Sequence, residues 1–543
     1  MTLETERIFK YSNEDRGTRH PLGAHVLKPR ERSQKKKHLV AAELPNTPLS
    51  SDCNSSRDAQ PTNHWISKSM ALTIILVSTW FFQRNGRAPS PGSSSILNVG
   101  DTQSGMLMRL AAQIADLSAT LPCSGHGYLE IVSTEGSAAT CKCYECFGGV
   151  DCSQVINTCV IDLDHGDPTM FEDFWFRNGG NSITVILGYQ RMSYFAQSKH
   201  VWFMESELDQ QIRALHQVVG NAVTEGRHIV VGTGSTQLFQ AVLYALSSPD
   251  QPKPTNIVSA APFYSSYPSV TDYLRSALFK WAGDAAKFDP AAESAPYIEM
   301  VTSPNNPDGK IQHAIVNGTG HVVHDLAYYW PHFTPVTEAA DHDVMLFTLS
   351  KSTGHAGTRI GWAILKDEKV AKKMIKFLEL QTIGVSHDSQ VRATQILKAV
   401  VQGYASTASH ELADHRSYNR QSSLQHSDTN KLFHFGSSVM QYRWKRLRSA
   451  LNTSSELSIL DFEPSYCTFF EKEVDHAPAF AWIRCKKVLD CQDLLKKNRI
   501  ITRSGRHFGV GREYVRLSML ERNQKFEMMV DRLARIDSSR TPD

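Results

Sequence analysis

A lysine followed by an arginine, in a segment of small polar residues, is the strongest chemical signal in the sequence. Lys351 and Arg359 lie in TLSKSTGHAGTRIGW, which spans residues 348–362 and overlaps the end of the strand-like run VMLFTLS. Ligands of an open α/β sheet bind outside the carboxyl ends of its strands, so we expect Lys351 at a cleft. An isolated lysine is usually a surface charge. Here small hydroxyl residues flank it and an arginine follows eight positions later, which suits a Schiff-base lysine beside a phosphate site.

A glycine turn upstream could hold the phosphate. The segment HIVVGTGSTQLFQAVLYAL reads as a strand, a glycine turn and the start of a helix, and it places Ser235 and Thr236 in the first helical turn. Backbone N–H groups and the helix dipole at such an N-terminus bind a phosphate dianion, and the two hydroxyl groups can add donors. A single Gly-x-Gly turn is weak support, because many are merely tight turns.

Three further segments follow strand-like runs and carry groups that suit a planar cofactor. Tyr264 in AAPFYSSYP offers an aromatic face, and Asn306 in SPNNPDG offers an amide in a turn before proline. Asp325 and Tyr328 lie three residues apart in VVHDLAYYW. Each residue alone has an ordinary structural role, as a core aromatic, a turn residue or a helix cap. Their order along the chain and their positions at strand ends favour a shared site.

The elements that must position these residues alternate between strand and helix. Apolar runs bounded by Gly and Pro predict strands at 228–231, 256–259, 297–302, 321–324 and 344–349. Helical periodicity predicts helices at 205–219, 237–246 and 369–380. Such alternation predicts an α/β fold with a mostly parallel, doubly wound sheet.

Composition excludes several protein classes. The chain has 543 residues, of which 41% are hydrophobic and 21% charged, so it can bury a sizeable core and is neither disordered throughout nor a multi-span membrane protein. The 58 Lys and Arg residues nearly balance the 55 Asp and Glu residues, so no global basic field indicates nucleic-acid binding. We also expect no metal site.

The first 120 residues differ from the rest. Residues 1–69 are polar with a basic run at 30–37, and we expect them to be disordered. Residues 70–84 contain the apolar run MALTIILVSTWFF at 70–82, which is too short for a typical span and fits a signal sequence or an uncleaved signal anchor; a buried core helix is the alternative. Translation starting at Met70 would explain the unusual tail before it. Residues 85–120 begin with APSPGSSS and read as a linker.

Six of the ten cysteines fall within residues 123–159. So short a segment cannot build an apolar core, which favours a disulfide-stabilised module at 121–160. Six thiols allow fifteen pairings, and their spacing does not choose among them. A zinc cluster is the competing interpretation, because Cys143 and Cys146 have ligand spacing. The apolar segment upstream, which implies an oxidising lumen, weakens that alternative.

The chain resembles the plant alliinase and tryptophan-aminotransferase-related family from about Asp162 to Arg535. The matching motifs are DHGDPT, MSYF, VVGTGSTQL, APFYSSYP, TSPNNPDG, HDLAYYWPHFTP, SKSTGHAGTRIGW and YVRLSML. CSGHG…CKCYECFGGVDCS resembles the EGF-like domain of plant alliinases. The resemblance implies a fold-type-I pyridoxal 5′-phosphate enzyme at 161–543, with a large domain at about 200–380 and a smaller α+β domain at 161–199 and 381–543. It also implies the disulfides Cys123–Cys141, Cys143–Cys152 and Cys146–Cys159, and a further bridge Cys485–Cys491.

The same resemblance implies a role for each candidate residue. Lys351 would form the Schiff base with the cofactor, and Asp325 would pair with the ring nitrogen. Tyr264 would stack on the ring, and Asn306 and Tyr328 would bind its 3-oxygen. The phosphate would be held by Ser235, Thr236, Thr348 and Arg359. On the substrate side, Arg516 would clamp the α-carboxylate, with Tyr194 and the backbone near Gly166 lining the site.

These roles fit two reactions. After Lys351 removes the α-proton, its return to the cofactor carbon leads to a 2-oxo acid, whereas loss of a β-sulfur substituent is C–S lysis. We expect an aminotransferase acting on tryptophan or another aromatic L-amino acid, with an indole-3-pyruvate type of product on the auxin route. An S-alkyl-L-cysteine sulfoxide lyase is the alternative, and a non-catalytic, membrane-tethered binding protein is a third.

The resemblance and the apolar segment also predict partners and location. A homodimer is implied, because active sites of fold-type-I enzymes usually lie at a subunit interface. We expect small amino-acid and 2-oxo-acid substrates and anchoring to a membrane through 70–82. The predicted location is the secretory pathway, in the membrane or lumen of the endoplasmic reticulum, with the vacuole or cell exterior as alternatives.

Overall fold

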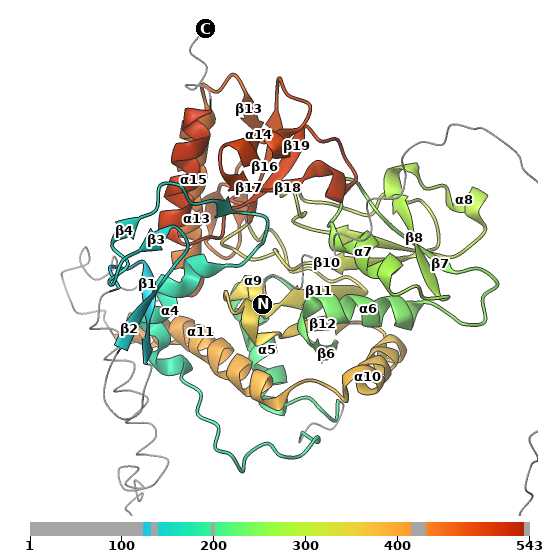
Figure 1. Ribbon diagram of the computed structural model, residues 1–543. Helices are drawn as coiled ribbons and strands as arrows, with labels where there is room; N and C mark the ends of the chain where they lie inside the picture. The colour runs from blue at the N-terminus through green and yellow to red at the C-terminus, as the bar shows by residue number, and fades with distance from the viewer. Residues whose placement is uncertain (1–122, 132–138, 197–200, 414–430, 537–543) are drawn as a thin grey trace, which may run out of the picture. The chain divides into compact units, whose positions relative to one another are not determined.

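The computed structural model describes residues 123–131, 139–196, 201–413 and 431–536 (Figure 1). The predictions for 1–69, 70–84 and 85–120 therefore lie outside the described residues. Among the helices that are described, none combines the length and the apolar character needed to cross a bilayer.

A seven-stranded sheet carries the site, with the strand order β6-β12-β11-β10-β9-β7-β8. Its strands are β6 (His228–Gly232), β7 (Thr255–Ser259), β8 (Phe279–Asp284), β9 (Tyr297–Thr302), β10 (His321–Asp325), β11 (Val344–Thr348) and β12 (Gly361–Leu365). The strands predicted from apolar runs are confirmed. Neighbours from β11 through β8 pair in parallel, while β12 runs antiparallel to both β11 and β6. The sheet is thus mixed.

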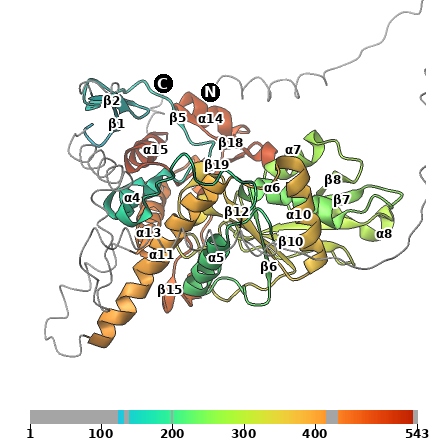
Figure 2. The ribbon, with the colours of Figure 1, turned by 90° about the horizontal axis from the view of Figure 1, so that it is seen from below.

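Helices cover both faces of this sheet. Every residue of β7, β9, β11 and β12 is buried. Because successive side chains of a strand point to opposite faces, both faces must be covered. The helices of this region are α5 (Ser206–Val219), α6 (Gly234–Leu246), α7 (Ser266–Tyr273), α8 (Pro290–Glu293), α9 (Leu349–Ser352) and α10 (Glu368–Thr382), with 3-10 turns η4 (Ala285–Lys287) and η5 (Ala356–Thr358). Helices α6 and α10 pack side by side (Figures 1 and 2).

A second, antiparallel sheet is formed by the C-terminal part of the chain. Its order is β13-β16-β19-β18, with β13 (Leu457–Ile459), β16 (Phe480–Cys485), β18 (Arg503–Ser504) and β19 (Tyr514–Ser518). The other elements here are the hairpin β14 (Ser465–Cys467) and β15 (Lys472–Val474), the turn η7 (Gly505–Phe508), and the helices α11 (His387–Ala413), α13 (Leu432–Leu451), α14 (Cys491–Lys497) and α15 (Asn523–Arg535). The boundaries of large and small domains stay a prediction.

The segment after the cysteine module joins this C-terminal part. Strand β5 (Ile161–Asp162) pairs in parallel with β17 (Ile500–Ile501). It leads into η2 (Thr169–Phe171), α4 (Glu172–Asn178) and η3 (Gly179–Ser182). Residues far apart in sequence therefore meet at the start of the catalytic region.

The cysteine module has two small hairpins, β1 (Gly127–Ile131) with β2 (Ala139–Cys143) and β3 (Phe147–Gly148) with β4 (Gln154–Val155). Its disulfides are Cys123–Cys141, Cys143–Cys152 and Cys146–Cys159, the pairs that the resemblance implies. Its own buried apolar cluster contains Cys123, Phe147 and Cys152, so the bridges supply what a larger core would otherwise provide. Cys485 and Cys491 are also bonded, and Cys467 is a buried free thiol.

Candidate active site

Strand register brings the predicted site residues together. Thr348, the last residue of β11, lies opposite Gly361 of β12, which in turn lies opposite Gly232 of β6. Lys351 follows the first of these strands, Arg359 precedes the second, and the turn before α6 follows the third. The loop between β11 and β12 and the turn after β6, which is more than 100 positions earlier (232 to 348), therefore meet at one edge of the sheet.

Lys351 lies on α9, whose start is capped by the Thr348 hydroxyl accepting from the Ser350 N–H at 3.3 Å. Its ammonium donates a hydrogen bond to the carbonyl oxygen of Gly166. Burial lowers the pKa of Lys351 to about 8, assisted by the positive charges of Arg516 and Arg359 and opposed by Asp167. A free amine is thus accessible near neutral pH, as a nucleophile and a general base require.

Asp325 ends β10 with its side chain buried. Its Oδ2 accepts a hydrogen bond of 2.9 Å from the Tyr267 hydroxyl, and its Oδ1 accepts one of 3.2 Å from the Ala327 N–H. Burial raises the pKa of Asp325, and these hydrogen bonds act against that shift. A buried carboxyl of this kind would be stabilised as a carboxylate by a cationic partner, such as a protonated ring nitrogen.

Arg516 is connected to two other predicted site residues by hydrogen bonds. From β19, its Nη1 donates to Asn306 Oδ1 at 3.0 Å and its Nη2 donates to the carbonyl oxygen of Asp164. The Asn306 amide in turn donates to the Tyr328 hydroxyl at 3.4 Å. The Nε of Arg516 is buried and has no partner among the described residues, so it is available to an incoming carboxylate.

An anion cradle forms where α6 begins. Its first residue, Gly234, has φ +74°, and a Cβ placed there would lie 2.3 Å from Nη2 of Arg359. The side chain of the N-cap residue Thr233 makes no capping hydrogen bond, although its N–H donates to Gln237 Oε1 at 2.7 Å, and Ser235 and Thr236 occupy the first turn. Free N–H groups, hydroxyl groups and a guanidinium gathered at one helix N-terminus suit a phosphate dianion.

Three predicted residues lie where their contacts do not indicate the predicted roles. The Thr348 hydroxyl, predicted as a phosphate ligand, is buried and engaged in capping α9. The Tyr194 side chain is 66% exposed, and no contact joins it to Lys351 or Arg516 among the described residues. Tyr264 lies half-buried with its ring 5.3 Å from the ring of Tyr267. These three roles stay predictions.

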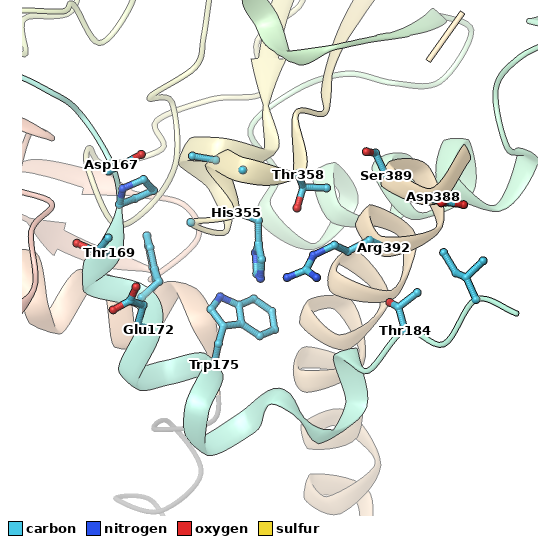
Figure 3. Close-up of a pocket in the computed structure, with 16 residues that line it drawn as sticks. Asp167, Thr169, Glu172, Trp175, Thr184, His355, Thr358, Asp388, Ser389 and Arg392 are labelled. Atoms are coloured by element: carbon cyan, nitrogen blue, oxygen red, sulfur yellow. The ribbon is translucent and has the colours of Figure 1, made fainter. Parts of the chain in front are cut away.

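A cavity of about 760 Å³ opens beside the site (Figure 3). Trp175 and His355 lie close together in it, their rings 4.7 Å apart, and Arg392 faces them from α11. The loop 354–358 lines this cavity, but Lys351, Asp325 and Arg516 do not. The cavity is therefore a neighbour of the site and does not enclose the reactive amine.

Two residues that hold the site in place were not predicted from the sequence. The Tyr267 hydroxyl lies 2.7 Å from the Thr302 hydroxyl and also donates to Asp325. His332 is buried, and its Nε2 donates to the backbone carbonyl of Lys351 at 3.1 Å. Both lie inside matched motifs, APFYSSYP and HDLAYYWPHFTP, but their polar side chains gain these partners only through tertiary packing.

The comparisons with known proteins agree with this geometry. The family model described as "Allinase" matches residues 161–537, which is most of the chain. The chain belongs to the alliinase family. A second model, for the alliinase EGF-like domain, matches residues 107–159. The predicted family and fold type I, with its disulfide-rich EGF-like module, are confirmed.

Relatives carry two kinds of name. Tryptophan aminotransferase-related protein 1 of Oryza sativa subsp. japonica is 50% identical over 69% of this chain and 82% of its own length. Tryptophan aminotransferase-related protein 2 of Arabidopsis thaliana is 47% identical over 69% of this chain and 81% of its own. Alliin lyase of Allium cepa is 35% identical over 77% of this chain and 85% of its own.

Enzymes of the alliinase family use pyridoxal 5′-phosphate, and the residues present fit that cofactor. The cradle at Gly234, Ser235, Thr236 and Arg359 suits its phosphate. The buried carboxyl of Asp325 suits its ring nitrogen, and the amine of Lys351, with its lowered pKa, suits its aldehyde.

Proposed function

We propose that this alliinase-family enzyme is an aminotransferase that converts an aromatic L-amino acid, tryptophan first, to its 2-oxo acid. The observation that carries the proposal is sequence identity, which is 47–51% to three tryptophan aminotransferase-related proteins and 35% to the alliin lyases. Aromatic side chains also surround Arg516. The centre of the Phe480 ring lies 4.1 Å from its guanidinium carbon, and that of Phe508 lies 5.3 Å away. Both rings are buried, so they hold in place the guanidinium that would bind the substrate carboxylate. The names of the relatives at 47–51% identity support the same reaction.

The residues of this chain would divide the work as follows. Pyridoxal phosphate, when bound, withdraws electrons from the α-carbon of an amino acid joined to it and so makes the α-proton acidic. Arg516 binds the substrate carboxylate and fixes the orientation of the α-carbon. Lys351, as the free amine, takes the α-proton and can return it at a different carbon. Asp325 keeps a proton on the ring nitrogen, and Tyr267 holds the carboxyl in place.

A C–S lyase acting on S-alkyl-cysteine sulfoxides is the second candidate. It is supported by the EGF-like domain match and by the alliin lyases at 35% identity. The full chain, produced in a secretory host, should be given L-tryptophan with a 2-oxo acid and, separately, an alkyl-cysteine sulfoxide. Indole-3-pyruvate from the first mixture supports the aminotransferase. Pyruvate from the second mixture, with no 2-oxo acid product from tryptophan, would reverse the ranking.

Arg516→Lys should raise KM for the amino acid about ten-fold or more while changing kcat less, because a point charge replaces the two-pronged guanidinium. Steady-state kinetics with the amino donor varied would measure this. Arg512→Lys is the matched control, since Arg512 is largely exposed and pairs with Asp490 at 3.7 Å. An unchanged KM in Arg516→Lys would remove Arg516 from the substrate site.

The lowered pKa of Lys351 predicts a pH dependence. The cofactor-free enzyme should bind pyridoxal phosphate faster as pH rises through about 8, because the amine must lose its proton to react. The rate should then level off, whereas an ordinary lysine, with a pKa of about 10.4, would give a rate that keeps rising. Stopped-flow absorbance at several pH values would distinguish the two profiles.

We also propose a secretory location and a homodimer. Four disulfides are typical of an oxidising compartment. The stretch 189–195 exposes large apolar side chains: Met192 is 82% exposed, Phe195 70% and Tyr194 66%. Such exposure is expected of a surface that a second copy covers. Anchoring through 70–82 belongs to the same proposal, and light scattering on the purified chain would test the dimer.

A further inference from the structure

The EGF-like module and the reactive lysine are linked by a very short stretch of chain. Cys159 closes the disulfide with Cys146, and β5 begins two residues later. Gly166, whose carbonyl oxygen accepts the hydrogen bond from Lys351, lies seven positions after Cys159 (159 to 166). A displacement of the module would therefore be transmitted to the groups around the amine.

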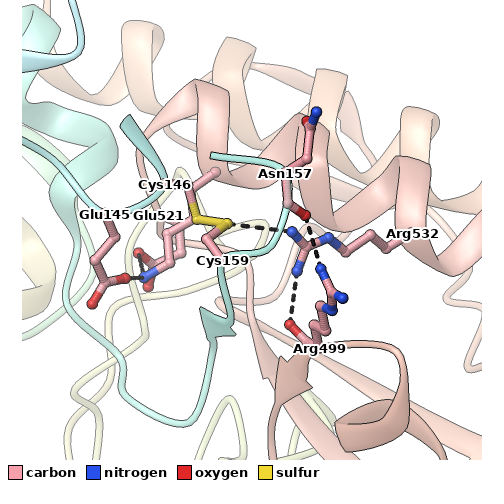
Figure 4. The surroundings of a disulfide bond; sticks show 8 residues. Glu145, Cys146, Asn157, Cys159, Arg499, Glu521 and Arg532 are labelled. Carbon is pink, nitrogen blue, oxygen red and sulfur yellow. Dashed lines mark hydrogen bonds and ion pairs between the residues drawn. A yellow bond between two sulfur atoms is a disulfide. The ribbon is translucent and has the colours of Figure 1, made fainter. Parts of the chain in front are cut away.

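One side of this disulfide is fixed to the C-terminal part of the chain. Arg532 of α15 donates to Cys159 Sγ at 3.3 Å and to the carbonyl oxygen of Arg499 at 2.8 Å (Figure 4). Arg499 in turn donates to the carbonyl oxygen of Asn157 at 3.1 Å. These contacts hold the end of the module against α15 and the strand β17 that pairs with β5.

On the other side of the disulfide, charged groups form a chain that leads to the active site. Lys525 Nζ lies 2.8 Å from Glu145 Oε2, on the module, and 3.2 Å from Glu521 Oε2. Glu521 Oε1 lies 3.3 Å from His165 Nδ1, a contact that is an ion pair only when the imidazole is protonated, and His165 is the residue before Gly166. Figure 4 shows Glu145 and Glu521 on this side, away from Arg499 and Arg532.

Two members of this chain are well shielded from water. The side chains of Lys525 and Glu521 are only 12% and 3% exposed. Charges in such surroundings interact more strongly than an exposed pair and are less screened by salt. By contrast, the pair of Lys142 and Glu130 on the β1–β2 hairpin of the same module is about half exposed and stays within that hairpin.

We propose that the EGF-like module is a positioning element of the active site, which acts through Glu145, Lys525 and Glu521 on the His165–Gly166 segment that orients the Lys351 amine. Lys525 and Glu521 are then positioning residues for Lys351. This inference rests on the proposed attachment of the cofactor to Lys351. It gives the module a function inside the enzyme itself, without a separate binding partner.

The test uses the full chain and follows the return of pyridoxal phosphate to cofactor-free protein. Lys525→Met should slow formation of the visible absorbance band about ten-fold, because a small misplacement of a reacting group costs up to about 10²-fold in rate. It should also change the visible circular dichroism of the bound cofactor, which reports its orientation. Lys525→Arg should behave like the wild type. Lys497→Met is the matched control, since Lys497 pairs with Asp493 on α14 at 2.8 Å.

A second variant covers the case in which Lys525→Met does not fold. Glu145→Gln neutralises a largely exposed carboxylate. It should slow formation of the absorbance band about two-fold, the size of effect expected of an exposed ion pair. Glu130→Gln on the same module should leave the rate unchanged. If Lys525→Met and Lys497→Met form the band at the same rate, the positioning role is wrong. If Lys525→Met does not fold, equal rates of band formation in Glu145→Gln and Glu130→Gln would show the same. If the wild type itself never forms the band, the proposed function fails as well.

Discussion

Replacing Lys351 with alanine should lower kcat by roughly 10²–10⁴-fold, the contribution of a positioned general acid–base group, and should abolish the visible band of the lysine-bound cofactor. The side chain is half-buried, and the hydrogen bond it donates goes to the Gly166 backbone, so the protein should still fold. Absorbance spectra, steady-state rates and a thermal unfolding curve measured on one preparation would separate loss of chemistry from loss of structure.

The matched control is Lys372→Ala, which removes the same group from an exposed position where Lys372 pairs with Glu368 at 2.9 Å. It should keep both the band and the rate. Borohydride reduction of the wild type followed by peptide mapping gives a direct reading of the attachment point. A label on any lysine other than Lys351 would disprove the proposed site, however the alanine variant behaves.

Asp325→Asn should leave cofactor bound but slow the reaction by roughly 10²–10³-fold, the range for removing one buried electrostatic partner of a developing charge. The amide is nearly the same size as the carboxyl and can keep the contact with Tyr267, so binding suffers less than rate. A primary isotope effect with α-deuterated substrate should increase, because α-proton removal becomes more rate-limiting.

Tyr267→Phe should slow the reaction for the same reason as Asp325→Asn, but by less. It removes one 2.9 Å hydrogen bond to Asp325 and leaves the carboxyl in place, so its rate loss should be smaller than that of Asp325→Asn. Asp341→Asn, on the surface beside Arg227, should behave like the wild type. Equal rates for Asp325→Asn and Asp341→Asn would rule out a role for Asp325 at the ring nitrogen.

Much of the fold and the site could be predicted because the signals are local. The strand before Lys351 is a continuous apolar run, and the turn before Ser235 and Thr236 is marked by glycines. Cysteine pairing could not be derived from spacing, and it came from the family resemblance. The antiparallel direction of β12 was not predicted either, since a strand pattern carries no information about direction.

What the sequence could not indicate depends on tertiary contacts. Tyr267 contacts Thr302 and Asp325, which come from two different strands. Lys525 meets Glu145 across 380 positions (145 to 525), a separation at which no periodicity or spacing rule applies. Tyr194 lies in a matched motif, yet its side chain is exposed, so the motif alone did not indicate whether it lines the site.

Because β11 and β12 run in opposite directions and pair in register, the loop that joins them, which contains Lys351 and Arg359, must have a fixed length. Thr348 and Gly361 face each other in register, and Gly361 leaves no room for a side chain, because a Cβ there would lie 2.6 Å from the Ser235 nitrogen. An inserted or deleted residue in this loop would slip β12 by one position and exchange the side chains on its two buried faces. The loop should therefore tolerate changes of residue type far better than changes of length.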